Sequence, residues 1–193
     1  MKKVLITGSS SGLGQALCKK FTSLNWTTIG ISKSNSENVT KSIIADFKDH
    51  QNLNNKLFDN KSDLKNLDLV ILNAGQLGRI DRAENITLSE LNEIIAINVL
   101  SNKLIIDFLK SQKKAIDFIA ISSGASLKPY SGWLQYCISK SALNQLIACC
   151  SPYENVFLIR SHRSAGSFML KVWTFKAGTK KLIRLFLSKV TAL

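Results

Sequence analysis

Three residues in the second half of the chain carry side chains that could move a proton to or from a substrate oxygen. Tyr136 and Lys140 lie four positions apart, so a helix places them on one face. A phenol titrates at about pH 10 in water. A neighbouring ammonium favours the phenolate and makes the hydroxyl a usable acid or base near neutral pH. Ser123, in the segment before Tyr136, offers a hydroxyl that can hold the substrate oxygen. Taken alone, Tyr-x-x-x-Lys also fits an ordinary half-exposed helical pair.

A glycine-rich stretch near the N-terminus has the pattern of a phosphate-binding turn. The apolar residues 4–6 are followed at once by residues 7–14, with the sequence TGSSSGLG, and a helical pattern begins at Leu13. A strand, a glycine turn and a helix together present backbone N–H groups and a helix N-terminus to a phosphate. The spacing Gly-x-x-x-Gly-x-Gly is a variant of the dinucleotide fingerprint, although such turns are also common without a ligand. The residues predicted to contact a nucleotide here are Gly8, Ser10, Ser11, Gly12, Leu13 and Gly14.

The end of the following strand indicates which dinucleotide would fit. Residues 26–32 are rich in β-branched side chains and are predicted to form a strand. In dinucleotide-binding folds an acid about 20 residues after the glycine turn accepts the ribose hydroxyls of NAD, whereas a basic residue suits the extra phosphate of NADP. Here the strand ends in Ser32 and Lys33, and the first acid is Glu37. This pattern favours NADP, with a solvated loop lysine as the alternative.

Strands and helices alternate along the chain, with crossovers long enough to join parallel strands. Such a pattern predicts an α/β fold, a doubly wound parallel sheet of about six strands with helices on both faces. The turn 73–75, Asn-Ala-Gly, follows an apolar strand at the edge where open α/β sheets bind ligands. The predicted strands are 4–6, 26–32, 42–47, 67–72, 115–121 and 156–159, and the predicted helices are 13–24, 89–109 and 134–150, with a polar, helix-compatible segment before residue 64.

The net charge of +13 is distributed unevenly. All 13 acidic residues lie at or before Glu154, and only basic charged residues follow it. Nucleic-acid binding is not predicted, because no recognition motif accompanies the charge. The apolar run after Lys2 and Lys3 is too short for a secretory signal, and no stretch has the length and apolarity of a transmembrane helix.

Cysteine usage indicates the compartment in which the protein works. The four cysteines include no C-x-x-C pair, and two of them are adjacent. Free thiols in a reducing cytoplasm are the expected state, so we predict a cytoplasmic protein. No set of metal ligands is assigned. The cysteines are Cys18, Cys137, Cys149 and Cys150.

Four features agree in order and spacing with one known family. They are the TGSSSGLG loop, the Asn-Ala-Gly turn at 73–75, Asn98 in the predicted middle helix, and Ser123 with Tyr136-x-x-x-Lys140. Over about residues 1–160 the chain resembles the short-chain dehydrogenase/reductase family. The resemblance implies a Rossmann-type fold that transfers a hydride between a nicotinamide cofactor and a carbonyl or alcohol carbon. It also implies a homo-oligomer.

The resemblance assigns roles to individual residues. It implies that Tyr136 exchanges a proton with the substrate oxygen, that Lys140 lowers the pKa of Tyr136 and holds the nicotinamide ribose, and that Ser123 orients the substrate. Asn98 would hold a water in a proton relay, with a kinking polar core residue as its alternative. The remaining residues implied are Asp46 at the adenine (or as a strand-end cap), Phe47, Asn73, Ala74 and Gly75 along the cofactor cleft, and Leu127, Tyr130 and Trp133 in a substrate loop.

Residues 160–193 depart from the family pattern. Members carry a Pro-Gly turn after the sixth strand, then a lid and a seventh strand, whereas here Gly166 has no preceding proline and we predict no seventh strand. We therefore predict an NAD(P)-binding domain with the catalytic residues at 1–160 and an atypical basic segment, helical in part, at 161–193. Three accounts of this segment compete: a divergent lid, a basic amphipathic helix for an anionic membrane surface or a partner, and a frameshifted tail without acids.

The sequence thus predicts an NADP-preferring oxidoreductase acting on a small-molecule carbonyl or alcohol, with NAD as a second possible cofactor. Its complete Ser123, Tyr136 and Lys140 set argues for an enzyme. The alternative is a catalytically impaired NADP-binding sensor or scaffold, which the missing Pro-Gly turn favours.

Overall fold

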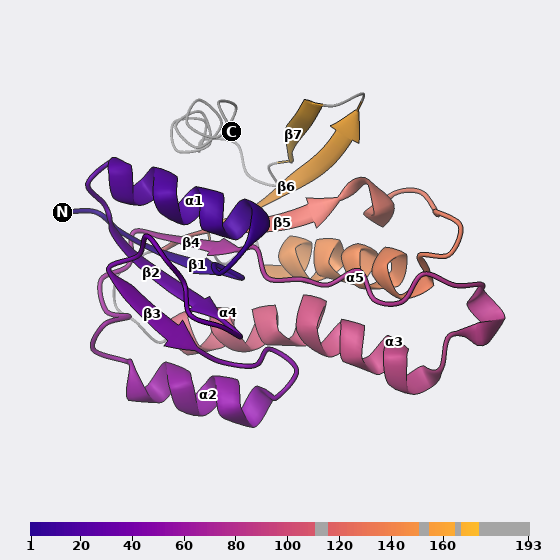
Figure 1. The fold of residues 1–193 in the computed structure, drawn as a ribbon, viewed down its shortest axis with the longest axis horizontal. Coiled ribbons are helices and arrows are strands. Elements are labelled where there is room, and N and C mark those ends of the chain that lie inside the picture. The colour runs from indigo at the N-terminus through magenta and orange to yellow at the C-terminus, as the bar shows by residue number, and fades with distance from the viewer. Residues whose placement is uncertain (111–115, 151–154, 165–166, 174–193) are drawn as a thin grey trace.

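A computed structural model of the chain describes residues 1–110, 116–150, 155–164 and 167–173 (Figure 1). One seven-stranded sheet runs through this part of the protein in the order β3-β2-β1-β4-β5-β6-β7. The first six strands in this order are parallel, and β7 pairs with β6 in the antiparallel direction. The strands are β1 (Lys3–Thr7), β2 (Thr27–Ser32), β3 (Lys41–Ile44), β4 (Leu69–Leu72), β5 (Asp117–Ser123), β6 (Asn155–Ser164) and β7 (Ser167–Trp173).

Helices cover both faces of the sheet, as the alternating pattern predicts. Helix α1 lies on one face, and α2, α4 and α5 lie on the other (Figure 1). The doubly wound parallel fold is confirmed. The helices are α1 (Gly12–Ser23), α2 (His50–Asp59), α3 (Leu88–Ile95), the π-helical turn η2 (Ala96–Leu100), α4 (Ser101–Lys110) and α5 (Leu134–Cys150), with short 3₁₀ turns η1 (Ala83–Asn85) and η3 (Gly124–Ser126).

Alternate residues of the strands pack into two separate cores. On β1, Val4 and Ile6 pack against Leu17 and Phe21 of α1. Leu5 points to the opposite face of the sheet and belongs to the other core. Successive strand side chains point to opposite faces, so a strand buried on both sides is apolar throughout. The second core is the larger one, and it joins α2, α4 and α5 to the sheet. The two cores hold the C-terminal edge of the parallel strands, where the candidate site lies.

The direction of winding reverses between β1 and β4. The chain adds β2 and β3 on one side of β1 and then returns to place β4 and β5 on its other side. At such a switch point the loops after the two neighbouring strands diverge and leave a crevice for a ligand. Here those loops are the glycine-rich stretch after β1 and the Asn-Ala-Gly turn after β4.

The predicted helix 89–109 is interrupted, which corrects the sequence-based assignment. Helix α3 ends at Ile95, the π-helical turn η2 follows, and α4 begins at Ser101. Thr87 caps α3 with a complete capping box to Glu90, which explains the start of the helix. The apolar pattern runs on through the π-turn because α3, η2 and α4 all contribute buried residues, so periodicity alone did not reveal the break.

The expectation that no seventh strand follows β6 is wrong. β6 continues to Ser164, so the predicted domain boundary at residue 160 falls inside a strand, and β7 pairs with it antiparallel. Residues 167–173 form a short, mostly apolar run, SFMLKVW, that includes aromatic and β-branched residues, which is a strand signal. The predicted tail helix within residues 180–190 lies outside the described residues. Among the described helices, none is long and apolar enough to cross a membrane.

Candidate active site

The glycine loop packs its backbone directly against the end of β4. Gly8 has φ +66°, in the left-handed region that favours glycine, and a Cβ there would lie 2.9 Å from Cα of Ala74. A Cβ on Gly14 would lie 2.0 Å from the carbonyl oxygen of Gly8, which is an overlap with backbone. Helix α1 therefore begins against the loop itself, and its N-terminus faces the crevice. This arrangement requires glycine at both positions.

Hydrogen bonds tie the glycine loop to the Asn-Ala-Gly turn. Asn73 Nδ2 donates to the carbonyl oxygens of Thr7, at 3.0 Å, and Gly8, at 3.3 Å. In the other direction, the backbone N–H groups of Asn73 and Ala74 each donate to Thr7 Oγ1 at 2.9 Å. Thr7 is fully buried. The two loops of the switch point are thus fixed relative to each other.

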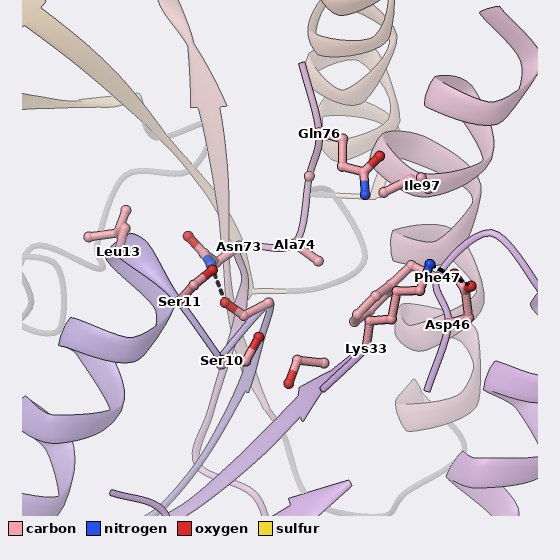
Figure 2. A pocket seen from close by; sticks show the side chains of 13 residues that line it. Ser10, Ser11, Leu13, Lys33, Asp46, Phe47, Asn73, Ala74, Gln76 and Ile97 are labelled. Atoms are coloured by element: carbon pink, nitrogen blue, oxygen red, sulfur yellow. Dashed lines mark hydrogen bonds and ion pairs between the residues drawn. The ribbon is translucent and has the colours of Figure 1, made fainter. Parts of the chain in front are cut away.

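A cavity of about 320 Å³ opens between these loops and the ends of β2 and β3 (Figure 2). Most of the predicted nucleotide contacts line it, and two residues that the sequence did not single out, Gln76 and Ile97, join them. Gly12 and Gly14 do not line the cavity but shape the turn beside it. The predicted residues that line it are Gly8, Ser10, Ser11, Leu13, Ser32, Lys33, Asp46, Phe47, Asn73, Ala74 and Gly75.

Two charged side chains meet at the rim of this cavity. Lys33, after β2, lies 3.4 Å from the carboxylate of Asp46, after β3 (Figure 2). The lysine side chain is 69% exposed and the aspartate side chain 29% exposed. Exposed ion pairs contribute little free energy, about 0–1 kcal/mol. The ammonium of Lys33 is therefore held near the cavity by a contact that another anion can replace.

Ser123, Tyr136 and Lys140 lie together beyond the Asn-Ala-Gly end of the cavity. Ser123 ends β5, and Tyr136 and Lys140 are consecutive-turn neighbours on α5. A hydrogen bond joins the side chains of Tyr136 and Ser123. The Nζ of Lys140 lies 5.6 Å from the centroid of the Tyr136 ring and donates to the carbonyl oxygen of Ile121 at 2.9 Å. The three predicted side chains are brought together.

Gly75 connects this group to the cavity. It lines the cavity, and a Cβ built on it would lie 3.3 Å from Lys140 Nζ and 3.1 Å from Asn98 Oδ1. Lys140 and Asn98 thus lie directly behind the cavity wall. A larger residue at position 75 would separate the cavity from the lysine.

Asn98 is fully buried in the π-turn, and its amide joins three segments. Its Oδ1 accepts from the Gln76 N–H at 2.8 Å, and its Nδ2 donates to the Gln76 carbonyl at 2.9 Å. The same Nδ2 donates to Ser139 Oγ at 2.8 Å. Ser139 precedes Lys140 on α5. The Asn98 amide therefore fixes the segment after Gly75 against the helix that carries Tyr136.

Aromatic rings lead from the loop before α5 to Tyr136. The rings of Tyr130 and Trp133 lie 5.2 Å apart, and those of Trp133 and Tyr136 lie 5.8 Å apart and nearly perpendicular. Leu127 in the same loop is exposed. An apolar substrate next to Tyr136 would contact this aromatic row.

The family of the chain follows from comparison with known proteins. Residues 2–153 match the family model described as short chain dehydrogenase. The chain belongs to the short-chain dehydrogenase family. The resemblance carried by the glycine loop, the Asn-Ala-Gly turn and the Tyr-x-x-x-Lys pair is thereby confirmed.

Individual relatives of this short-chain dehydrogenase are oxidoreductases. A benzil reductase ((S)-benzoin forming) of Bacillus cereus is 29% identical over 172 residues, covering 80% of this chain and 69% of the relative. A short chain dehydrogenase family protein from Francisella tularensis shares 27% identity with a TM-score of 0.71, over 79% of this chain and 63% of that structure. The 4-hydroxyisoleucine dehydrogenase complexed with NADH, at 20% identity and a TM-score of 0.71 over 81% of this chain and 72% of that one, shares the fold.

The chain spans only 63–69% of the length of the curated relatives it matches. The described residues nevertheless suit a nicotinamide dinucleotide. Ser11 stands at the N-cap of α1 without a side-chain bond to the first turn, and the glycine loop brings that helix end to the cavity. A phosphate at this point would receive N–H groups from the helix start.

Burial, rather than Lys140, dominates the titration of Tyr136 in this short-chain dehydrogenase. Burial raises the pKa of Tyr136, against the opposing effect of its hydrogen bond with Ser123. The lowering of this pKa by Lys140, which the resemblance implies, stays a prediction. Lys140 is itself buried, at 3% exposure, and burial lowers its pKa to about 8. Its ammonium points to the Ile121 carbonyl instead.

Sequence reasoning missed several residues that build the site. Thr7 stood inside the quoted TGSSSGLG motif without a role, although a buried threonine that accepts two N–H bonds fixes the loop. Gln76 directly follows the Asn-Ala-Gly turn, and this position could have suggested that it lines the cavity. Ser139 lies on the Asn98 side of α5, and no local signal marks its partner, because the two residues are 41 positions apart.

Proposed function

We propose that this short-chain dehydrogenase transfers a hydride between a nicotinamide cofactor, with NADP preferred, and the carbon of a carbonyl or alcohol. The observation that carries the proposal is the convergence of Ser123, Tyr136 and Lys140 beside the cavity, with Gly75 between the lysine and that cavity. A proton donor, a buried cation and a cavity for the cofactor are the parts that such a reaction needs from the protein.

The cavity offers a contact for each part of the dinucleotide. The glycine loop and the start of α1 would hold the phosphates, Asp46 and Phe47 the adenine, and Lys140 the nicotinamide ribose. Lys33, after β2, would contact the additional phosphate of NADP, because a phosphate can replace the exposed carboxylate of Asp46 as its partner. When bound, reduced NADP supplies the hydride.

The side chains beyond the cavity handle the proton. Because burial raises its pKa, Tyr136 keeps its proton at neutral pH and would give it to the carbonyl oxygen during reduction. Ser123, within hydrogen-bond contact of Tyr136, would hold the same oxygen in line. Lys140, with a pKa of about 8, is mostly an ammonium at pH 7 and would stabilise the phenolate that forms. Asn98, which fixes Gln76, would support a water that returns a proton.

An aromatic ketone is the first substrate class to test. The row of Tyr130, Trp133 and Tyr136 offers ring faces and edges beside the proton donor. The Bacillus cereus relative reduces benzil, as its name states. We therefore propose benzil and related aryl ketones as candidate substrates.

We also propose that the protein works in the cytoplasm as a homo-oligomer. All four cysteines are free, which suits a reducing compartment.

The test begins with cofactor binding and continues with turnover. NADPH and NADH are titrated into the purified full chain, and NADPH oxidation is then followed with benzil and a panel of other ketones and aldehydes. Ser123→Ala should retain NADPH binding and lose about 100-fold in kcat/KM, because the oxygen loses a positioned donor. Tight NADPH binding with no oxidation of NADPH by any member of the panel would favour the sensor or scaffold instead.

A further inference from the structure

The π-turn that carries Asn98 is held by side chains from outside its own backbone ladder. Ser101 Oγ donates to the carbonyl of Ile97 at 2.6 Å, and Asn102 Nδ2 donates to the carbonyl of Asn98 at 2.8 Å. His50 Nε2 lies 3.1 Å from the carbonyl oxygen of Ala96. Three successive carbonyls of the turn therefore accept side-chain hydrogen bonds. π-Turns inside helices are rare and frequently lie at functional sites, and side-chain hydrogen bonds of this kind stabilise one.

His50 differs from the other two partners because it comes from another part of the fold. Ser101 and Asn102 belong to α4, the helix that continues the turn, whereas His50 is the first residue of α2. A carbonyl can only accept, so the contact requires that Nε2 of His50 carries a hydrogen. This fixes the neutral ring as the Nε2–H tautomer while the contact lasts.

The contact links two walls of the cofactor cavity. Asp46 and Phe47 line the cavity four and three residues before His50, and Asp49 caps α2 by accepting from the N–H of Asn52. On the other side Ile97, the residue after Ala96, lines the same cavity. The His50 to Ala96 hydrogen bond thus joins the wall beside the adenine subsite to the turn that carries Asn98.

The π-turn also sets the position of the segment after Gly75. Asn98 holds both backbone groups of Gln76 and also Ser139. A displacement of the turn would move the Asn98 amide away from Gln76 N–H and from the helix that carries Tyr136 and Lys140. Because the interior around Asn98 is close-packed, small displacements there alter the donors and acceptors available to the substrate.

We propose that His50 is a positioning residue of the active site: by bonding Ala96 it holds the π-turn so that Asn98 fixes the wall between cavity and proton donor. His50 does not contact the substrate and acts only through the π-turn. The inference rests on the proposed function for its effect on turnover, but its structural part can be tested without turnover.

The experiment compares three variants of the full chain. His50→Leu removes the donor, and His50→Gln keeps an amide N–H near the place of Nε2. Gln51→Ala is the matched control, because Gln51 lies next to His50 on α2 and donates to Asn55, away from the π-turn. The first readout is amide hydrogen exchange at Gln76, whose N–H donates to Asn98, with Ile6 in β1 as the reference for global opening.

His50→Leu should speed exchange at Gln76 by about threefold to tenfold relative to Ile6, which corresponds to the loss of one hydrogen bond. The same variant should lower kcat by a similar factor and leave the dissociation constant of NADPH within about twofold of the wild-type value. His50→Gln should restore both properties for the most part, and Gln51→Ala should change neither.

The inference is overturned if Gln76 exchanges at the wild-type rate in His50→Leu, or if Gln76 and Ile6 are accelerated equally. It is also overturned if kcat is unchanged while exchange at Gln76 rises. Failure of the proposed function has a different signature: the wild-type chain would then bind no NADPH or oxidise none, whereas the exchange comparison would still report on His50.

Discussion

Lys33 Nζ lies 3.4 Å from Oδ2 of Asp46 at the rim of the cofactor cavity. The basic side chain that favours NADP is therefore already paired, and the phosphate of NADP would have to replace a carboxylate. Replacing the Asp46 carboxylate by a phosphate costs little free energy, because the ion pair is exposed to solvent. It also places Lys33 on the cavity side before any ligand arrives.

Lys33→Ala should lower the affinity for NADPH by about tenfold, because a charge-assisted hydrogen bond to a phosphate is lost. The affinity for NADH, which lacks that phosphate, should change by less than about twofold. Fluorescence titration of both cofactors measures the ratio. Lys48→Ala is the control, because Lys48 is also exposed but pairs with Glu93. An unchanged NADPH-to-NADH ratio in Lys33→Ala would contradict the proposed preference.

Two glycines of the loop should respond very differently to alanine. A Cβ on Gly14 would lie 2.0 Å from the Gly8 carbonyl oxygen, whereas a Cβ on Gly12 has nothing within 4 Å. Gly14→Ala should therefore cost at least about 2 kcal/mol of unfolding free energy and abolish NADPH binding. Gly12→Ala should cost about 1 kcal/mol for its φ of +52° alone. Urea denaturation compares the two, and equal losses would contradict the loop geometry.

Much of this site could be predicted from the sequence because its signals are local. The glycine loop, the Asn-Ala-Gly turn and the Tyr136 and Lys140 pair are each contiguous or a single helical turn apart. Each is ambiguous alone, and their agreement in order and spacing is what identifies them. Their positions at strand ends then follow from the alternation of strands and helices.

What the sequence did not show depends on contacts between distant segments or on a balance of energies. His50 and Ala96 are 46 residues apart, and no pattern links them. The π-turn is hidden because its apolar residues keep the helical spacing. Spacing to Lys140 indicates proximity but not burial, and it is burial that raises the pKa of Tyr136.

Thr7→Val should weaken the link between the two loops of the switch point. The Ala74 N–H, which donates to Thr7 Oγ1 at 2.9 Å, would be left buried without that acceptor. The expected cost is about 1–2 kcal/mol of unfolding free energy, with weaker NADPH binding. Thr7→Ser keeps the hydroxyl and should recover most of both. If valine and serine at this position behave alike in denaturation and titration, the hydroxyl is not the link.

The burial of Lys140 predicts how stability depends on pH. Its pKa is about 8 in the folded chain and 10.5 when unfolded, so between these values the unfolded chain binds more protons. Stability therefore rises with pH across this window, and the burial penalty is fully present below about pH 8. Lys140→Met removes this titration. Between pH 7 and pH 10 the unfolding free energy of the wild type should therefore rise by roughly 2 kcal/mol relative to that of Lys140→Met.

Denaturant unfolding at several pH values measures this shift. Other titrating groups contribute equally to both proteins, so the comparison isolates Lys140. If the difference in unfolding free energy between the two proteins stays constant from pH 7 to pH 10, the lowered pKa of Lys140 is contradicted.

The most direct test of the account is the role of Tyr136. Tyr136→Phe keeps the ring that packs against Trp133 and removes only the hydroxyl. With benzil and NADPH, the variant should bind NADPH within about twofold of the wild type and lose at least about 100-fold in kcat, as expected when a positioned proton donor is removed. If the wild type reduces benzil or another ketone and Tyr136→Phe reduces it at the same rate, the assignment of this tyrosine as the proton donor is contradicted.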